Sequence, residues 1–255
     1  MFVCQPDRTV GTEEGLPISS FQIKLVACAA MLIDHLGALF LVLYPQYIFF
    51  VLFRVVGRIS FPLFAFIAAN AALHTRNIGN YAKRLFLFAL LSEIPFNLFM
   101  NLVTNEPVSI YRIQNQNVLF TFAAGIFAVM LYNEAKAHEK MLAKVLLIFA
   151  VILTFCATAY CKTDYGVTGV LIILTLYIIM STAKIPDKHR KAAVLCVMII
   201  ASAFLGTDPI TQIAALCSIV FIALYKNQKG RSFRWAFYMF YPVHFLVLTL
   251  IGTRI

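Results

Sequence analysis

The chain has 255 residues, of which 62% are hydrophobic and 13% are charged, and its formal net charge is +10. Soluble domains are usually about 45–50% apolar and about 25% charged, so this composition excludes an ordinary soluble domain and indicates a polytopic membrane protein. A basic soluble domain would suggest nucleic-acid binding, but basic residues of membrane proteins collect in cytoplasmic loops. We therefore expect no nucleic-acid partner.

The chain begins with a polar segment, residues 1–20, which we expect to be a cytoplasmic tail, and continues as one transmembrane domain over 21–255. A span needs about 20 predominantly apolar residues. Nine runs fit or approach this length, so we predict an all-α protein with about nine transmembrane helices. The second run is expected to be tilted or broken near Gly57–Pro62. The nine runs are 21–43, 47–72, 81–101, 117–132, 143–160, 165–181, 192–206, 210–225 and 235–252.

The charges of the loops predict the orientation. With nine spans, one face receives 16 of the 21 Lys and Arg residues. The other face, whose longest loop is 102–116, receives Arg112, Lys162 and Arg254. Because positive loops stay in the cytoplasm, we expect a cytoplasmic N-terminus and an external C-terminus, with the protein in the inner membrane. The 16 residues are Arg8, Lys24, Arg76, Lys83, Arg84, Lys136, Lys140, Lys144, Lys184, Lys188, Arg190, Lys191, Lys226, Lys229, Arg231 and Arg234.

The cysteines give no sign of a metal site. The chain has six, with no CxxC pair and no metal-ligand spacing. Most of them lie in apolar runs, where Cys behaves as a small hydrophobic residue. We therefore expect no structural metal.

Ionisable side chains interrupt four of the predicted spans. A charge at the bilayer centre costs at least about 2.5–3.5 kcal/mol on insertion scales, so such residues are usually paired or functional. At 1.5 Å per residue, each of these groups except Arg54 lies about 14–20 Å into its helix, and we expect those groups to converge at one depth, with Arg54 closer to the outer interface. In this cluster we expect Asp34 to pair with Arg58, while Glu93 or a backbone carbonyl orients His35. The interrupting residues are Asp34, His35, Arg54, Arg58, Glu93 and His244.

Lys24 and His35 are eleven residues apart, which is close to three helical turns, so they share one helix face about 16.5 Å apart along the axis. Lys24 is expected at the cytoplasmic surface and His35 deep in the membrane. A coenzyme A with its phosphates at that surface could extend its pantetheine arm over such a distance. Lys83 and Arg84 lie at the same surface and could share the phosphates.

Six segments together resemble the TraX family, which takes its name from a conjugation protein that acetylates the N-terminus of F-type pilin. The resemblance covers most of the chain from about residue 21 to 250, and IDHLG, GRISFP and SEIPFN in this order are its specific motifs. The segments are IKLVACAAMLIDHLGALF at 23–40, RVVGRISFPLFAFIAA at 54–69, YAKRLFLFALLSEIPFNL at 81–98, NVLFTFAAG at 117–125, DYGVTGVL at 164–171 and FYPVHFLVL at 240–248.

TraX proteins in turn resemble transmembrane acyltransferases of the acyltransferase-3 type. Those enzymes carry a basic residue, ten further residues and then a His on the first helix, a pattern that Lys24 and His35 match. They also carry a basic pair near the second helix, which Arg54 and Arg58 resemble. The resemblance implies acetyl-CoA as the acyl donor, used from the cytoplasm, with the first-helix His as the catalytic residue.

These observations predict an integral membrane acetyltransferase that acts on an amine or hydroxyl of a protein or glycan. We expect neutral His35 to be the general base and Arg58 to stabilise the oxyanion. The predicted catalytic residues are His35, Asp34, Arg58 and Glu93; the cofactor-binding residues are Lys24, Lys83, Arg84 and Arg54; the substrate-binding residues are Asn117, Tyr165 and His244.

Two other functions stay open. The same buried charges suit the proton relay of a coupled transporter or flippase, although no inverted repeat is visible. A non-catalytic assembly factor is the third possibility, but it gives the mid-depth cluster no task.

Overall fold

The computed structural model describes residues 18–104, 115–205, 209–228, 230–231 and 233–254. The predicted tail, up to residue 17, and most of the predicted outer loop, including Arg112, lie outside these ranges. Within them the chain is helical, apart from an isolated bridge between Ile18 and Tyr225. The helices are α1 (Ser20–Leu43), η1 (Ile48–Phe50), α2 (Val51–Gly57), α3 (Ser60–His74), α4 (Ile78–Thr104), α5 (Val118–Ala137), α6 (Met141–Tyr160), α7 (Gly166–Ser181), α8 (Asp187–Leu205), α9 (Pro209–Leu216), α10 (Ser218–Ala223) and α11 (Arg234–Gly252).

Six helical segments of the described chain are long and apolar enough to cross a membrane, so the all-helical, multi-pass prediction is confirmed at this level. Gly166–Ser181 and Ile213–Ala223 are apolar but shorter. The predicted seventh span corresponds to α8, whose first turns are polar, and the predicted eighth is divided between α9 and α10. The six long segments are Ser20–Leu43, Ile48–His74, Ile78–Thr104, Val118–Ala137, Met141–Tyr160 and Trp235–Gly252.

The predicted break in the second span is confirmed, because α2 ends at Gly57 and α3 begins at Ser60. Two glycines allow α1 and α2 to cross closely beside this break. A Cβ on Gly37 would lie 2.6 Å from Cβ of Phe53, and a Cβ on Gly57 would lie 2.1 Å from Cβ of Asp34. The absence of both side chains thus brings the α2 backbone against the acidic residue of α1.

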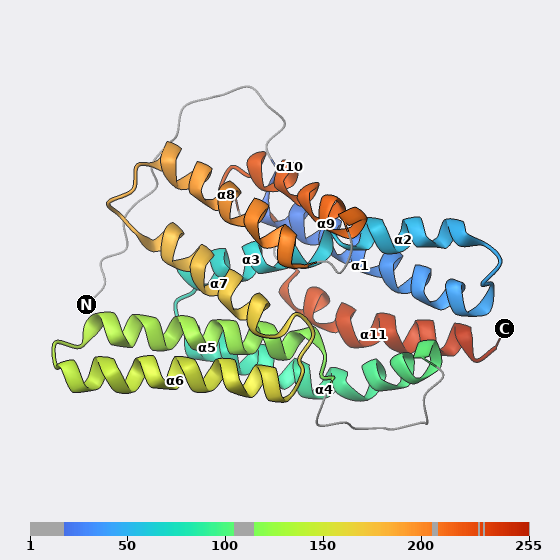
Figure 1. Ribbon diagram of the computed structural model, residues 1–255, viewed down its shortest axis with the longest axis horizontal. Coiled ribbons are helices and arrows are strands. Elements are labelled where there is room, and N and C mark those ends of the chain that lie inside the picture. The colour runs from blue at the N-terminus through green and yellow to red at the C-terminus, as the bar shows by residue number, and fades with distance from the viewer. Residues whose placement is uncertain (1–17, 105–114, 206–208, 229, 232, 255) are drawn as a thin grey trace.

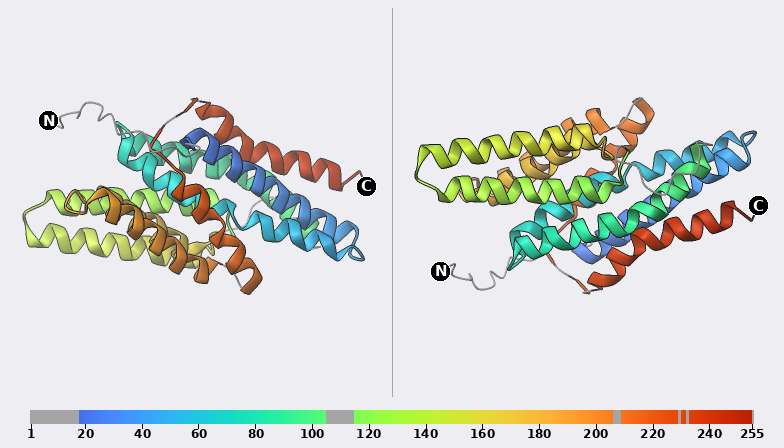
Figure 2. Two further views of the ribbon diagram at one scale, coloured as in Figure 1. Left: turned by 90° about the horizontal axis from the view of Figure 1, so that it is seen from above. Right: turned by 90° about the horizontal axis from the view of Figure 1, so that it is seen from below.

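The helices form two groups that meet near the middle of the molecule (Figure 1). α1 contacts α2, α3, α4 and α11, and α11 also packs along α4. α5 contacts α4, α6 and α7, while α7 also contacts α3 and α8. The further views in Figure 2 show α1, α2, α4 and α11 extending toward the C-terminal end, and the α5–α6 hairpin extending the opposite way. The site described below lies where the two groups meet.

Local sequence signals explain where two of the key helices begin. Ser19 and Gln22 form a capping box at the start of α1, with the Gln22 amide N–H donating to the Ser19 hydroxyl. Asn117 caps α5 and accepts a hydrogen bond from the Leu119 amide at 3.0 Å. These caps fix the positions at which α1 and α5 enter the bundle.

Candidate functional site

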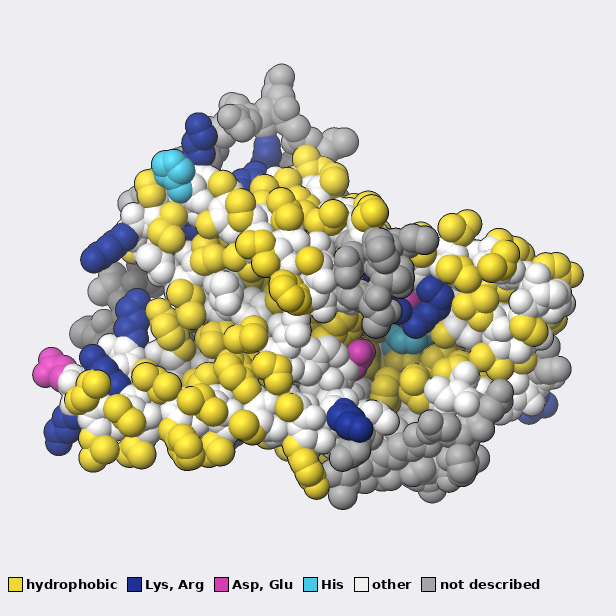
Figure 3. Space-filling view, in the orientation of Figure 1, with side chains coloured by type: hydrophobic (Ala, Val, Ile, Leu, Met, Phe, Trp, Pro, Cys, Tyr) yellow, Lys and Arg dark blue, Asp and Glu magenta, His cyan; other side chains and the backbone are white. Residues whose placement is uncertain are grey.

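Two of the cavities in the described part of the chain differ in charge. The basic cavity, of about 410 Å³, is lined by Lys24, Arg84 and Arg231 near the N-terminal ends of α1 and α4. The ionic cavity, of about 370 Å³, lies further along the same two helices. Figure 3 shows basic, acidic and histidine side chains meeting in a hollow whose other walls are largely hydrophobic. The ionisable side chains of the ionic cavity are Asp34, His35, Arg54, Arg58, Lys162, Asp164, Tyr165 and Tyr241.

The two cavities lie back to back. Five residues line both of them and form a largely apolar partition: Met31, Phe64, Val118, Phe122 and Tyr241. Met31 lies one helical turn before His35. Lys24 therefore lines one cavity and His35 the other, with Met31 in the partition, while the path predicted between Lys24 and His35 stays a prediction.

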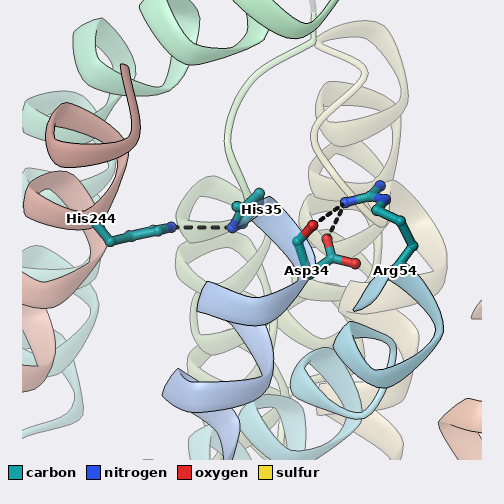
Figure 4. A network of polar contacts seen from close by, with 4 residues as sticks. All are labelled: Asp34, His35, Arg54 and His244. Atoms are coloured by element: carbon teal, nitrogen blue, oxygen red, sulfur yellow. Dashed lines mark hydrogen bonds and ion pairs between the residues drawn. The ribbon is translucent and has the colours of Figure 1, made fainter. Parts of the chain in front are cut away.

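His35 contacts His244, which was not predicted, and the backbone carbonyl that was one of the two predicted partners is that of Met31. His244 Nε2 lies 3.2 Å from His35 Nδ1 (Figure 4). The two rings have centroids 5.1 Å apart, and the ring of Phe245 packs against both. Equal depth on α1 and α11 was predictable, but this direct contact was not.

The hydrogen bonds of the two rings determine which nitrogens carry protons. His244 Nδ1 lies 3.0 Å from the Phe240 carbonyl oxygen, and because that oxygen can only accept, Nδ1 of His244 donates. In the neutral ring, Nε2 of His244 must then accept, so Nδ1 of His35 donates to it. The Met31 carbonyl also accepts from His35. In a neutral His35 that donates from Nδ1, the lone pair is on Nε2.

Asp34 forms its ion pair with Arg54, so the predicted Asp34–Arg58 pair is wrong as stated. Arg54 Nη1 lies 2.5 Å from Asp34 Oδ2 and 3.1 Å from the Asp34 carbonyl oxygen (Figure 4). The close α1–α2 crossing at Gly57 accounts for this choice, because it turns Asp34 toward the α2 backbone. Asp34 Oδ1 is buried without a hydrogen-bond partner among the described residues.

Arg58 reaches a different part of the ionic cavity. It interacts with the Tyr165 hydroxyl and lies in the electrostatic field of Asp34 and Asp164. Its Nε is buried and unbonded in the described part of the chain. The predicted basic pair is therefore divided: Arg54 neutralises Asp34, while Arg58 faces the cavity beside Tyr165.

Glu93 and Asn117 bind each other and line neither cavity. Asn117 Nδ2 donates to Glu93 Oε2 at 2.6 Å and to the Ala89 carbonyl at 2.9 Å. Asn97 Nδ2 donates to Glu93 Oε1 at 3.2 Å. These buried contacts join α4 to the start of α5, so the structure gives both residues a packing role and separates them from His35. Their predicted catalytic and substrate-binding roles stay predictions.

The predicted cofactor-binding residues are also divided. Lys24 and Arg84 line the basic cavity, and the Lys24 ammonium lies 5.5 Å from the centre of the Phe237 ring. Lys83 is exposed and lines neither cavity, and Arg54 lines the ionic cavity. Arg231, which the sequence analysis did not single out, joins Lys24 and Arg84.

Asp164 is the functional candidate that sequence reasoning missed. It lines the ionic cavity from the turn between α6 and α7. Partial loss of hydration raises the pKa of Asp164 to about 6, against the opposing effect of Arg58. The available signal was an acidic residue next to the predicted substrate-binding Tyr165.

Comparison with known proteins places this arrangement in a family. The model of the family described as TraX protein matches residues 19–252, which include every described residue of both cavities. This chain belongs to the TraX family. It is also 31% identical over 250 residues to the probable fimbrial assembly protein FimC, serogroup H1, of Dichelobacter nodosus. The alignment covers 91% of this chain and 95% of that relative. No solved structure matches the chain.

The structure shows where the three motifs that resemble the TraX family lie. IDHLG carries Asp34, His35 and Gly37, and GRISFP carries Gly57 and Arg58, so these two motifs build the ionic cavity and the close crossing behind it. SEIPFN carries Glu93 and Asn97, which belong to the buried amide network. Two of the motifs therefore contribute to the ionic cavity, and the third contributes to the packing of α4 against α5.

Proposed function

We propose that this TraX family protein is a membrane acetyltransferase that moves an acetyl group from acetyl-CoA to an amine or hydroxyl acceptor. The supporting observation is the histidine pair. His244 holds the Nδ1 proton of His35, which leaves the basic Nε2 of His35 available in a cavity that also contains Arg58. A neutral imidazole beside a fixed cation is what base-assisted acyl transfer to a nucleophile requires.

The orientation and the full span count belong to this proposal. In Figure 3, Lys and Arg side chains gather at the end of the molecule opposite the C-terminus. The positive-inside tendency supports a cytoplasmic N-terminus, an external C-terminus and nine crossings, three of them made by α7, α8 and α9–α10. The basic cavity then opens toward the cytoplasm, where acetyl-CoA is available, and the protein resides in the inner membrane.

The donor would bind with its phosphates at Lys24, Arg84 and Arg231. Charge-assisted hydrogen bonds from these cations suit phosphate oxygens. The pantetheine arm would extend along the aromatic wall of the basic cavity toward Met31. Because the partition separates that cavity from His35, we propose that the thioester displaces the Met31 side chain, which is flexible and unbranched.

Transfer then needs few steps. His35 Nε2 removes a proton from the acceptor as its nitrogen or oxygen attacks the thioester carbonyl, and Arg58 stabilises the resulting oxyanion. Collapse of the tetrahedral intermediate breaks the carbon–sulfur bond. The thiolate leaves and takes the proton from His35, which returns to its neutral form. The His244 hydrogen bond stabilises the positive charge that His35 carries in between.

The acceptor is proposed to be a protein or glycan of the cell envelope. The TraX family is linked to pilin acetylation, and the relative in Dichelobacter nodosus bears the name of a fimbrial assembly protein. These names favour a pilus-related acceptor. The ionic cavity, on the far side of the partition, would receive it.

One observation favours the transporter as the second candidate. Two cavities that lie on either side of a shared partition also suit alternating access. Purified protein in liposomes, supplied with acetyl-CoA labelled in the acetyl group, separates the two functions. The enzyme releases CoA thiol and transfers or hydrolyses the label, whereas a transporter moves solute without cleaving the thioester. No thioester cleavage above the rate of protein-free liposomes would refute the acetyltransferase.

A further inference from the structure

Asp164 presents its carboxylate to the ionic cavity from a turn that is fixed by its own backbone. Its amide N–H donates to the Gln116 carbonyl at 2.9 Å, and its carbonyl accepts from the Thr121 hydroxyl at 2.5 Å. The Thr121 hydroxyl also lies 2.8 Å from that of Thr163. The main chain of Asp164 is therefore attached to the start of α5 on both sides, and its side chain lines the ionic cavity.

The next residue holds the turn in an unusual conformation. Tyr165 has φ = 62° and ψ = −6°, in the left-handed region that a non-glycine residue seldom occupies. Its ring stacks on Phe61 with centroids 3.7 Å apart and planes 12° apart. Gly169 permits this packing, because a Cβ there would lie 2.6 Å from Thr121 and 3.0 Å from Phe61. Such backbone strain persists only where the surroundings enforce it, and it occurs often at functional sites.

The carboxylate has no close cationic partner among the described residues. Arg58, Arg54 and Asp34 act on it electrostatically, but no Lys or Arg nitrogen of the described chain lies within 4.0 Å of it. The Tyr165 amide is its one protein hydrogen-bond donor there. Asp164 is solvent-accessible and is one of the residues that line the ionic cavity. By contrast, the Asp34 carboxylate in the same cavity is paired with Arg54.

We propose that Asp164 is the acceptor-binding residue of the ionic cavity and that its carboxylate binds the ammonium group of an amine acceptor in preference to a hydroxyl. This inference rests on the proposed acetyltransferase function and adds a residue with a defined task. A charge-assisted hydrogen bond to a carboxylate is stronger than a neutral one, so Asp164, which has no ion pair among the described residues, favours a cationic acceptor. His35, which lines the same cavity, would act on the same acceptor group.

The protons balance in such a reaction. The bound ammonium gives one proton to water in the cavity before its nitrogen can attack. As the carbon–nitrogen bond forms, His35 takes a second proton and passes it to the departing CoA thiolate. The net reaction converts acetyl-CoA and an ammonium into an amide, CoA thiol and one proton.

The test uses two probe acceptors that differ in the nucleophile alone, 2-phenylethylamine and 2-phenylethanol. The full-length purified protein is assayed as wild type, Asp164→Asn, Asp164→Glu and the control Asp187→Asn, which removes an exposed carboxylate at the start of α8. We expect Asp164→Asn to raise the KM for the amine about 10- to 100-fold, since a charge-assisted bond contributes about 1.5–3 kcal/mol. The KM for the alcohol and the KM for acetyl-CoA should stay within about twofold.

Asp164→Glu should restore part of the amine preference, and Asp187→Asn should behave as the wild type. An unchanged amine KM in Asp164→Asn would overturn this inference alone, provided that the wild type cleaves acetyl-CoA. Wild-type protein that cleaves acetyl-CoA but transfers nothing to the amine would also overturn it. Failure of the wild type to cleave acetyl-CoA at all would instead refute the proposed function, and this inference with it.

The pH profile gives an independent readout. Because the pKa of Asp164 is raised to about 6, the carboxylate is charged above that pH and neutral below it. The KM for the amine should therefore rise as the pH falls through about 6. In Asp164→Asn this rise should be smaller, because only the contribution of the other titratable groups remains. A rise of the same size in the variant would contradict the assignment. The other titratable or charged groups lining this cavity are Asp34 and His35 of α1, Arg54 of α2, Arg58 after it, Lys162 and Tyr165 of the turn, and Tyr241 of α11.

Discussion

Replacing His244 tests the hydrogen-bond chain that leaves His35 Nε2 basic. His244→Phe keeps a planar ring against Phe240 and Phe245, whose centroids lie 4.9 Å and 4.0 Å from that of His244, but it removes the acceptor for the His35 Nδ1 proton. The Met31 carbonyl still accepts from His35, so the preference of His35 for the Nδ1-protonated tautomer becomes weaker but is not lost.

The expected loss follows from the change in charge. A hydrogen bond between neutral groups contributes about 0.5–1.5 kcal/mol, and one to a charged group about 1.5–3 kcal/mol. When His35 takes up a proton, its bond to His244 strengthens by the difference, about 1–1.5 kcal/mol. Since each 1.36 kcal/mol changes a rate about tenfold, His244→Phe should lower kcat about 10-fold.

The assay measures release of CoA thiol by purified protein at a saturating acceptor concentration, with acetyl-CoA varied. The KM for acetyl-CoA should not change, because His244 lines neither cavity. His244→Gln places an amide oxygen near the position of Nε2, so it should recover most of the rate. Wild-type kcat in His244→Phe, or a Gln variant as slow as the Phe variant, would refute the proposed hydrogen-bond chain.

Three further predictions test the two cavities and their crossing. Lys24→Met should raise the KM for acetyl-CoA about 10-fold through loss of a charge-assisted phosphate contact, while Lys83→Met should leave it unchanged; equal effects of the two substitutions would contradict the donor site. Gly57→Ala places a Cβ 2.1 Å from that of Asp34, so it should lower the thermal stability measured by scanning fluorimetry, at a cost of about 1–3 kcal/mol; unchanged stability would show that α1 and α2 do not cross this closely. Met31→Trp should fill the partition and abolish transfer, while acetyl-CoA still protects the variant against thermal unfolding; full transfer activity would show that the acetyl group takes another route.

The sequence predicts the elements of this fold better than their contacts. Hydrophobic length and the positions of Gly57 and Pro62 were sufficient to predict the long helices and the break in the second span. The charge of the Asp187–Lys191 segment, at the start of α8, and the division at Cys217 made the later spans harder to define. The position of a residue within its span gives its depth in the membrane, and this depth predicted that Asp34, His35 and Arg58 meet at one cavity.

Predicting which side chains pair inside that cavity would have required knowing how the helices cross. Arg54 and Arg58 share a helix face, so spacing alone could not decide which of them meets Asp34; the glycine contacts at Gly37 and Gly57 decide it. Glu93 has the same depth as His35 but faces the start of α5. Asp164 was missed because it belongs to a turn, and only the folded turn brings it into the cavity.

The most direct test of the account is the rate of acetyl transfer by His35→Ala beside His138→Ala, which removes an exposed histidine at the end of α5. Loss of a general base lowers a rate about 10²- to 10⁴-fold. We predict a loss of this size in kcat for His35→Ala, with an unchanged thermal shift on adding acetyl-CoA, and wild-type rates for His138→Ala. A His35→Ala protein that releases CoA thiol and acetylates its acceptor at the wild-type rate would contradict the account.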